Sequence, residues 1–183
     1  MKNRSLSLLL AVVGFAVVAF PARGTAEDYV FSVSVLGGVG GSLDGEPTSG
    51  FGNRSFQLGI GVPTDLNTSV TLRVGRLDLG NRPLFEGLEK ARLEYADVAG
   101  EYHFSESYYT SGLFLGLGAY RLAGDAAGGR QETTQIGAVF GANGEFGITR
   151  RLTFLIELSG HYVNFNDSAR IYAMAHAGLA YHF

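Results

Sequence analysis

The sequence predicts an all-β fold: one antiparallel barrel of eight strands that follow one another around the barrel in chain order. Three observations support this prediction. Eight segments place apolar side chains at every second position, which is the periodicity of a strand with two different faces. Glycine is abundant, at 27 residues against 4 prolines, and it is interspersed among apolar residues. Charged residues make up only 17% of the chain, whereas hydrophobic residues make up 46%.

The first 26 residues are predicted to be a signal peptide that precedes the barrel. Lys2 and Arg4 come before an apolar run over residues 6–20, and small residues ending at Ala26 form a cleavage site. The apolar run is shorter than the roughly 20 residues that a helix needs to span a bilayer. We therefore expect cleavage after Ala26 and a single domain, the barrel, over residues 27–183.

Removal of the signal peptide makes the chain acidic. It takes three of the 14 Lys and Arg residues and none of the 17 Asp and Glu residues, which leaves 11 basic and 17 acidic residues and a net charge of −6. This balance excludes a basic nucleic-acid binder. The absence of cysteine excludes disulfide frameworks, thiolate metal sites and cysteine nucleophiles.

The first four alternating segments cover residues 29–35, 56–62, 70–75 and 92–104. Large apolar residues occupy one parity of each segment, and smaller or polar residues occupy the other. In chain order, the apolar sets are Tyr29, Phe31, Val33 and Val35; Phe56, Leu58, Ile60 and Val62; Val70, Leu72 and Val74; and Val98, Tyr102 and Phe104. The fourth segment is ambiguous in parity at its start and regular from Asp97 onward. Each segment predicts one strand.

The last four segments cover residues 112–120, 135–146, 152–161 and 171–183. They show the same alternation over longer stretches. In chain order, the apolar sets are Leu113, Leu115 and Leu117; Ile136, Ala138, Phe140 and Phe146; Leu152, Phe154, Ile156 and Leu158; and Ile171, Ala173, Ala175, Leu179, Tyr181 and Phe183. An even number of strands, each two-faced, is what a closed meander barrel requires.

The second face of the strands decides the environment of the barrel. In a soluble barrel the interior is apolar and the exterior is charged. Here the positions opposite the apolar sets hold glycine and scattered charges, too few to solvate an outer surface. We therefore predict a transmembrane barrel whose apolar face meets lipid and whose polar face lines a narrow lumen.

The connections alternate in length, which predicts an orientation in the membrane. Three are short, at residues 63–68, 105–107 and 149–151, and four are longer, at residues 41–54, 80–91, 122–132 and 164–169. Barrels of bacterial outer membranes have short periplasmic turns and longer outer loops, so we expect both termini in the periplasm. Aromatic residues gather at the same strand ends, as expected of a girdle at a membrane interface. They are Tyr29, Phe31, Tyr102, Phe104, Tyr109, Phe146, Phe154, Tyr181 and Phe183.

The last eight residues carry the most specific motif of the chain. His176, Gly178, Tyr181 and Phe183 resemble the polar-x-Gly-x-x-aromatic-x-aromatic assembly signal of small eight-stranded outer-membrane barrels. With the strand pattern, this motif makes residues 28–183 resemble the family of the OmpA transmembrane domain and the OmpX-like proteins, described broadly as porin-family outer-membrane β-barrels. The resemblance implies a place in the outer membrane of a Gram-negative cell envelope. It also implies contact with the barrel-assembly machinery and periplasmic chaperones during biogenesis.

Six ionisable residues are predicted to form a network inside the barrel. They lie on the polar faces of the strands: Arg73, Glu101, His103, Glu145, Glu157 and His161. Arg73 and Glu101 are expected at similar depth on neighbouring strands. An eight-stranded barrel has an interior just wide enough for side chains to fill it, so we expect a polar plug that closes the lumen. The family resemblance implies the same.

The predicted function is that of an integral outer-membrane barrel with a structural or surface-interaction role, and not that of an enzyme. One alternative is a narrow gated pore for small solutes or ions. Another is a lipid A-modifying enzyme, because Glu157, Ser159, His161 and His176 lie on the last two strands. The outer-membrane lipid A 3-O-deacylases use a His-x-Ser pair, however, and the serine is missing after His161.

Further partners are predicted from composition and from the longer connections. The four histidines lack the spacing of metal ligands, so we expect neither a metal nor a cofactor. Residues 41–54 and 80–91 are the expected sites for any surface ligand, since loops face the outside. We expect a monomer surrounded by outer-membrane lipid.

Overall fold

A computed structural model of the chain describes residues 30–43, 51–80, 89–105, 109–126, 129–165 and 168–183. The predicted signal peptide, residues 1–26, lies outside these ranges. Parts of the connections at residues 41–54 and 80–91, which we expect to carry any surface ligand, lie outside them too.

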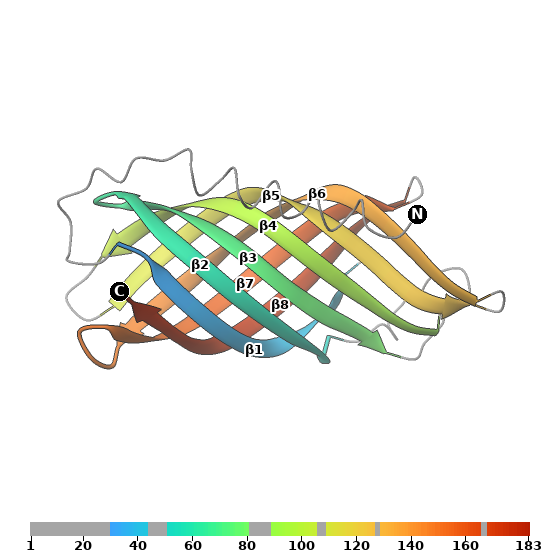
Figure 1. Cartoon of the computed structure of the whole chain (residues 1–183), viewed down its shortest axis with the longest axis horizontal. Coiled ribbons are helices and arrows are strands. Elements are labelled where there is room, and N and C mark those ends of the chain that lie inside the picture. The colour runs from blue at the N-terminus through green and yellow to red at the C-terminus, as the bar shows by residue number, and fades with distance from the viewer. Residues whose placement is uncertain (1–29, 44–50, 81–88, 106–108, 127–128, 166–167) are drawn as a thin grey trace.

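The described residues form eight strands. They are β1 (Ser32–Ser42), β2 (Asn53–Asp65), β3 (Thr68–Gly80), β4 (Glu89–Ser105), β5 (Tyr109–Ala126), β6 (Gly129–Gly147), β7 (Leu152–Phe165) and β8 (Ser168–His182). Each strand pairs with the next, and β8 pairs antiparallel with β1, so the sheet closes into a barrel (Figure 1). The predicted fold class, an eight-stranded antiparallel meander barrel, is confirmed. Among the described residues, no helix is long and apolar enough to cross a membrane.

The register of the strands fixes their tilt. From Ser32 on β1, the paired residues lead around the barrel through Gly61, Thr71, Ala99, Gly116, Val139, His161 and Tyr172 to Ser42. Ser42 lies ten residues further along β1 than the starting point. A stagger of this size over eight strands corresponds to a tilt of roughly 40° from the barrel axis. The strands cross the long axis obliquely in Figure 1, and the interior is narrow enough for side chains to fill.

The two ends of the barrel differ. At one end, here called the short-turn end, lie the β2–β3, β4–β5 and β6–β7 connections together with the C-terminus (Figure 1). Val30 donates to the carbonyl of Phe183 over 2.7 Å, which ties the start of the described chain to its end. The opposite end, here called the long-hairpin end, holds the other four connections. The expected alternation of short and long connections is present only in part. Residues 43–52 and 81–88 separate β1 from β2 and β3 from β4, but only residues 127–128 and 166–167 separate β5 from β6 and β7 from β8. The longer connection expected at residues 164–169 is wrong, because Asn164 pairs with Ala169 and Phe165 with Ser168.

The strands extend further at the long-hairpin end than the sequence predicts. Residues 122–132, expected to be a loop, pair across the β5–β6 hairpin up to Ala126 and Gly129. That expectation is wrong. The segment lacks the apolar alternation of a lipid-facing strand, because its outward side chains do not meet lipid.

The apolar sets predicted from the sequence face outward. On β5, for example, Leu115 is 69% exposed and Leu117 is 68% exposed, while Phe114 between Leu113 and Leu115 is buried inside. On β2 the outward residues Phe56, Leu58 and Ile60 alternate with Ser55 and Gln57, which are buried. This continuous outer apolar band is here called the belt.

Aromatic residues mark the edge of the belt at the short-turn end. Phe31 stacks on Phe183 with 4.6 Å between ring centroids, and Tyr181 meets Phe183 edge-on at 4.7 Å. The rings of Tyr109 and Phe146, and of Phe146 and Phe154, lie in contact as well. Apart from Tyr29, which lies outside the described residues, the predicted aromatic girdle is present at this end.

Some lumen glycines make room for aromatic rings. A Cβ atom on Gly75 would lie 2.4 Å from the ring of Tyr95, and one on Gly141 would lie 2.4 Å from Phe114. Real Cβ atoms do not approach that closely, so each ring occupies space that only glycine leaves free. The alternation of small and large residues therefore packs the interior.

Candidate functional site in the barrel lumen

Arg73 on β3 is the centre of the polar lumen. It is 1% exposed, and its guanidinium contacts three carboxylates. Nε donates to Oε2 of Glu157 on β7 over 3.1 Å, Nη2 donates to Oε1 of Glu101 on β4, and Nη1 lies 3.6 Å from Oδ1 of Asp97. The guanidinium carbon also lies 4.0 Å from the ring centroid of Phe114, a cation–π contact.

Amide and hydroxyl groups extend this cluster. Gln57 on β2 donates through Nε2 to Oε1 of Glu157 over 2.9 Å, and the hydroxyl of Tyr95 donates to Oε1 of Gln57 over 2.8 Å. Asn143 on β6 donates through Nδ2 to Oε2 of Glu101 over 3.3 Å. Residues of β2, β3, β4, β6 and β7 are thus joined across the lumen, which holds their register.

The charges in this cluster do not balance. One guanidinium faces three carboxylates, and Arg73 is the one buried Lys or Arg among the described residues. The carboxylate oxygens of Asp97 accept no hydrogen bond from the described residues. Removal of the arginine would leave several buried carboxylates without a cation.

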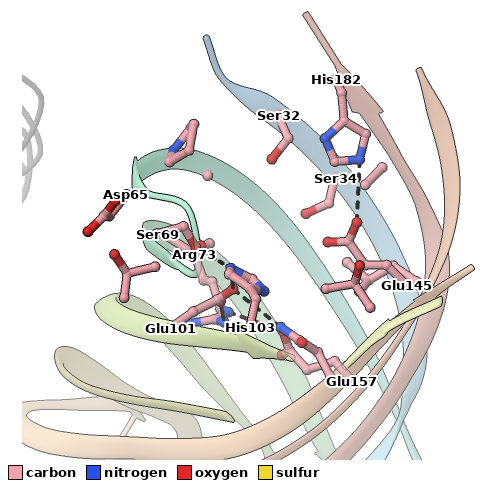
Figure 2. A pocket seen from close by; sticks show the side chains of 18 of the residues that line it. Ser32, Ser34, Asp65, Ser69, Arg73, Glu101, His103, Glu145, Glu157 and His182 are labelled. Atoms are coloured by element: carbon pink, nitrogen blue, oxygen red, sulfur yellow. Dashed lines mark hydrogen bonds and ion pairs between the residues drawn. The ribbon is translucent and has the colours of Figure 1, made fainter. Parts of the chain in front are cut away.

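Four of the six predicted lumen residues gather around the Arg73 guanidinium, and the other two lie apart from it. Arg73, Glu101 and Glu157 meet directly. His103 joins them at the edge, since its Nε2 lies 2.8 Å from Oγ of Ser69 and 3.8 Å from Oε2 of Glu101. Figure 2 shows these four side chains gathered on one side of the cavity.

Glu145 and His161 lie apart from Arg73. Glu145 lies 3.4 Å from Nε2 of His182 and accepts a hydrogen bond from Thr153, on the other side of the cavity in Figure 2. His161 is fully buried between Ser159 and Tyr120, nearer the long-hairpin end.

Sequence reasoning missed four members of the cluster: Gln57, Tyr95, Asp97 and Asn143. Asp97 lies directly opposite Arg73 in the register, whereas Glu101 is four residues further along β4 and opposite Ser69. The parity that places Glu101 in the lumen also places Asp97 there, so parity alone could have found it. The neutral residues carry no such signal.

A cavity of about 490 Å³ reaches from the β2–β3 turn to Arg73. Hydroxyl and ionisable side chains line most of it (Figure 2). Its polar lining includes Ser32, Ser34, Asp65, Ser69, Thr71, Arg73, Glu101, His103, Thr110, Asn143, Glu145, Glu157 and His182. We call it the vestibule. It places polar groups inside the part of the barrel that the belt surrounds.

Apolar side chains fill the lumen beyond the Arg73 cluster, toward the long-hairpin end. They form one buried set, here called the plug: Leu77, Leu79, Ala91, Leu93, Tyr95, Tyr120, Leu122, Val163, Phe165, Tyr172 and Met174. Five strands contribute to it, and nearly all of its members are less than 5% exposed. The sequence predicts that polar side chains alone close the lumen, and the apolar side chains in this half differ from that prediction.

Two serine–histidine contacts occur in the lumen. Oγ of Ser159 lies 3.1 Å from Nε2 of His161, and Oγ of Ser55 lies 2.8 Å from Nε2 of His176. A hydrolytic triad needs a carboxylate on the other ring nitrogen. Nδ1 of His161 instead meets the hydroxyl of Tyr120, and Nδ1 of His176 has no hydrogen-bond partner among the described residues. The described residues also contain no group of three His, Asp or Glu side chains placed to hold a metal.

The residues of the C-terminal motif divide between the two faces of β8. His176 is buried in the lumen, whereas Tyr181 and Phe183 face outward in the aromatic girdle. Gly178 packs against β1, where a Cβ atom would lie 2.0 Å from the carbonyl oxygen of Val35. The motif therefore sits on the strand pair that closes the barrel.

Comparisons with known proteins bear on the fold. No protein-family model matches the sequence, and no curated protein matches it. Among solved structures, Neisserial surface protein A matches with a TM-score of 0.68 at 14% identity, over 84% of this chain and 97% of that one. The N-terminal β-barrel domain of OprF from Pseudomonas aeruginosa matches with a TM-score of 0.56 at 16% identity, over 83% and 97%.

The attachment invasion locus protein Ail of Yersinia pestis is a third match. Its TM-score is 0.54 at 19% identity, over 85% of this chain and all of that one. At such low identities the matches establish the architecture, and they agree with the resemblance seen in the sequence. The chain has the fold of the small eight-stranded outer-membrane β-barrels.

Proposed function

We propose that the protein is an integral outer-membrane barrel with a structural or surface-interaction role and a closed lumen. One observation carries this proposal: the interior is filled twice, by the Arg73 cluster and by the plug. A barrel filled in this way offers no aqueous path between its ends. Its functions then lie in its outer surface and its connections.

The height of the belt supports a membrane location. On β6, every outward residue from Ile136 to Phe146 is uncharged. At about 3.3 Å per residue and a tilt of roughly 40°, this stretch covers about 25 Å along the barrel axis, which is the height of the apolar band in outer-membrane barrels. Lipid contact explains why large apolar side chains such as Ile136, 79% exposed, face outward.

The two ends support an orientation. The aromatic girdle and the C-terminus share one end, whereas the two longest stretches between strands, residues 43–52 and 81–88, lie at the other. We assign the first end to the periplasm. The C-terminal motif suits recognition by the barrel-assembly machinery there. Labelling of single cysteines introduced at Thr149, in the β6–β7 turn, and at Gln131, in the β5–β6 hairpin, tests this assignment in intact cells. An impermeant thiol reagent should label position 131 and spare position 149, and the reverse result would refute the orientation.

Conductance tests the closed lumen. The mature chain, refolded in detergent and shown to be folded by a heat-dependent gel shift, should give no channel steps in a planar bilayer. Stable steps at neutral pH would overturn the proposal.

The second candidate is a narrow gated pore. The vestibule favours it, because a polar cavity already reaches Arg73 and its unbalanced carboxylates. A gate of this kind predicts channel steps whose size changes with pH. The plug argues against it, because opening would also require eleven packed apolar side chains to separate.

A further inference from the structure

Charged side chains appear on the outer surface as soon as the belt ends, toward the long-hairpin end. At the first outward position beyond the belt lie Arg54 on β2, Arg76 on β3, Glu94 on β4 and Arg121 on β5. Arg76, Glu94 and Arg121 are directly paired neighbours in the register. This set of four residues is here called the arginine row, and it carries a formal charge of +2.

The next outward positions are more acidic. They hold Asp78, Arg92 and Glu132, with a formal charge of −1. Arg92 donates to Glu94 over 3.0 Å, and Glu94 also lies 3.5 Å from Arg121. Arg76 in turn donates through Nε to Asp78 over 2.7 Å, and Arg121 also pairs with Glu132. Over both levels, four arginines therefore face three carboxylates, which leaves one positive charge.

Arg54 is the least engaged of the set. Its side chain is exposed and forms no ion pair with any residue in the described ranges. Its strand neighbour Phe56 is opposite Arg76 in the register, so the two arginines are diagonal neighbours on one face. Arg76 is also paired with Asp78 in an exposed ion pair, which contributes little stability. A phosphate at this place would bind Arg54 directly and share Arg76 with that carboxylate.

The positive charge is confined to one side of the barrel. At the corresponding positions of the other side, β7 has Asn164 and the chain beyond β1 has Leu43, which is 61% exposed. A uniform ring of arginines would suit general contact with headgroups. A one-sided row indicates a localised site.

The outer surface on the belt side of the arginine row is slightly recessed, because two small side chains lie there between larger ones. Ala96 on β4 and Ala119 on β5 are paired one outward position inside the belt, between the larger Val74 and Ile136. An acyl chain can lie against such a surface while its headgroup meets the arginines.

From the charge of the row, its position against the belt and this recessed surface, we propose that the arginine row binds the phosphate headgroup of an anionic lipid. The lipid belongs to the leaflet at the long-hairpin end. Under the orientation proposed above, that leaflet is the outer one, and the ligand is then a phosphorylated glycolipid of the lipid A class. The headgroup site itself does not depend on that orientation.

Native mass spectrometry of the folded barrel released from detergent tests the site. The probes are lipid A and a phosphatidylcholine of equal acyl length, each titrated separately. The double variant Arg54→Gln/Arg76→Gln should bind lipid A about thirtyfold more weakly, since each arginine near an anionic headgroup contributes roughly fivefold to the affinity. Phosphatidylcholine binding should be unchanged.

A matched variant controls for net charge. Arg150→Gln/Arg151→Gln removes the same two charges at the exposed β6–β7 turn, at the opposite end, and should leave lipid A binding unchanged. Unaltered affinity in the first variant, or an equal loss in the second, would refute the site. Competition by free inorganic phosphate to the same degree as by lipid A would refute a lipid ligand.

Two measures keep the test decisive if the double variant folds poorly. Arg54→Gln alone breaks no described ion pair and should still weaken binding severalfold. Each variant is first checked for the heat-dependent gel shift. The orientation experiment with cysteines is independent, so a wrong orientation changes the identity of the leaflet without removing the headgroup site.

Discussion

The two halves of the barrel use the same strands with opposite polarity. Where the belt surrounds the barrel, the outside is apolar and the inside holds Arg73 and its carboxylates. Toward the long-hairpin end, the outside carries charged residues such as Arg121 and Glu132, and the inside is the apolar plug. The first half is built for lipid and the second for water. The alternation of apolar and polar residues along a strand therefore shows only that its two faces differ. Whether lipid or water surrounds the barrel decides which face points inward.

The largest expected effect comes from the cation in the membrane half. Arg73→Met leaves three buried carboxylates without their guanidinium, which should cost about 4 kcal/mol of unfolding free energy. Urea titration of the barrel in lipid vesicles measures this loss. Unfolding is followed by gel shift or by tyrosine fluorescence, which no tryptophan obscures in this chain. A loss of less than 1 kcal/mol, which is typical of an exposed pair, would show that the cluster is well hydrated from the vestibule.

A cavity in the plug should have the next largest effect. Leu93→Ala removes a fully buried side chain and should cost about 3 kcal/mol. Its outward neighbour provides the contrast, since Glu94→Ala removes only partly exposed ion pairs and should cost under about 1 kcal/mol. Equal losses of unfolding free energy in the two variants would contradict an apolar inside and a polar outside in this half of the barrel.

A charge placed on the belt should cost slightly less. Leu115→Arg exposes a cation to lipid near mid-height and should destabilise the barrel by about 2–3 kcal/mol. The same residue introduced at Thr134, which faces outward beyond the belt, should be tolerated within about 1 kcal/mol. Similar values at both positions would place the membrane boundary elsewhere than at the arginine row.

The smallest effect concerns titration in the water-exposed half. The hydrogen bond from the Arg121 guanidinium lowers the pKa of the Glu132 carboxyl. Its ionic stabilisation is therefore present at neutral pH and is lost as the pH falls through that lowered pKa. Arg121→Gln should raise the pKa of Glu132 toward its ordinary value in a carbon-13 NMR titration. An unchanged pKa would show that Arg121 does not contact Glu132 in solution.

The sequence predicts the lipid-facing half of the fold well. Strict alternation of large apolar residues, as from Leu113 to Leu117, survives because lipid tolerates no charge on that face. Residues 122–132 were mistaken for a loop because beyond the belt the outward side chains turn polar and the inward side includes small residues. The period of two persists there, but its hydrophobic contrast is weak.

The site was only partly predictable for a different reason. Arg73, Glu101 and Glu157 could be selected because an ionisable residue on a lumen face is rare. Which of them meet depends on the stagger between strands, and parity does not reveal it. The stagger sets Asp97 opposite Arg73 and takes Glu145 to His182 instead.

On the side formed by β2 to β5, the belt has a sharp boundary at each end, with aromatic rings at the short-turn end and the arginine row at the other. Such a barrel cannot slide along the membrane normal without carrying guanidinium groups into hydrocarbon. Its stability therefore depends on how well the height of the belt matches the thickness of the bilayer. Thicker bilayers must thin around it, at a cost of a fraction of a kcal/mol for each Å of mismatch, so it partitions into thin membranes and into thin regions within them.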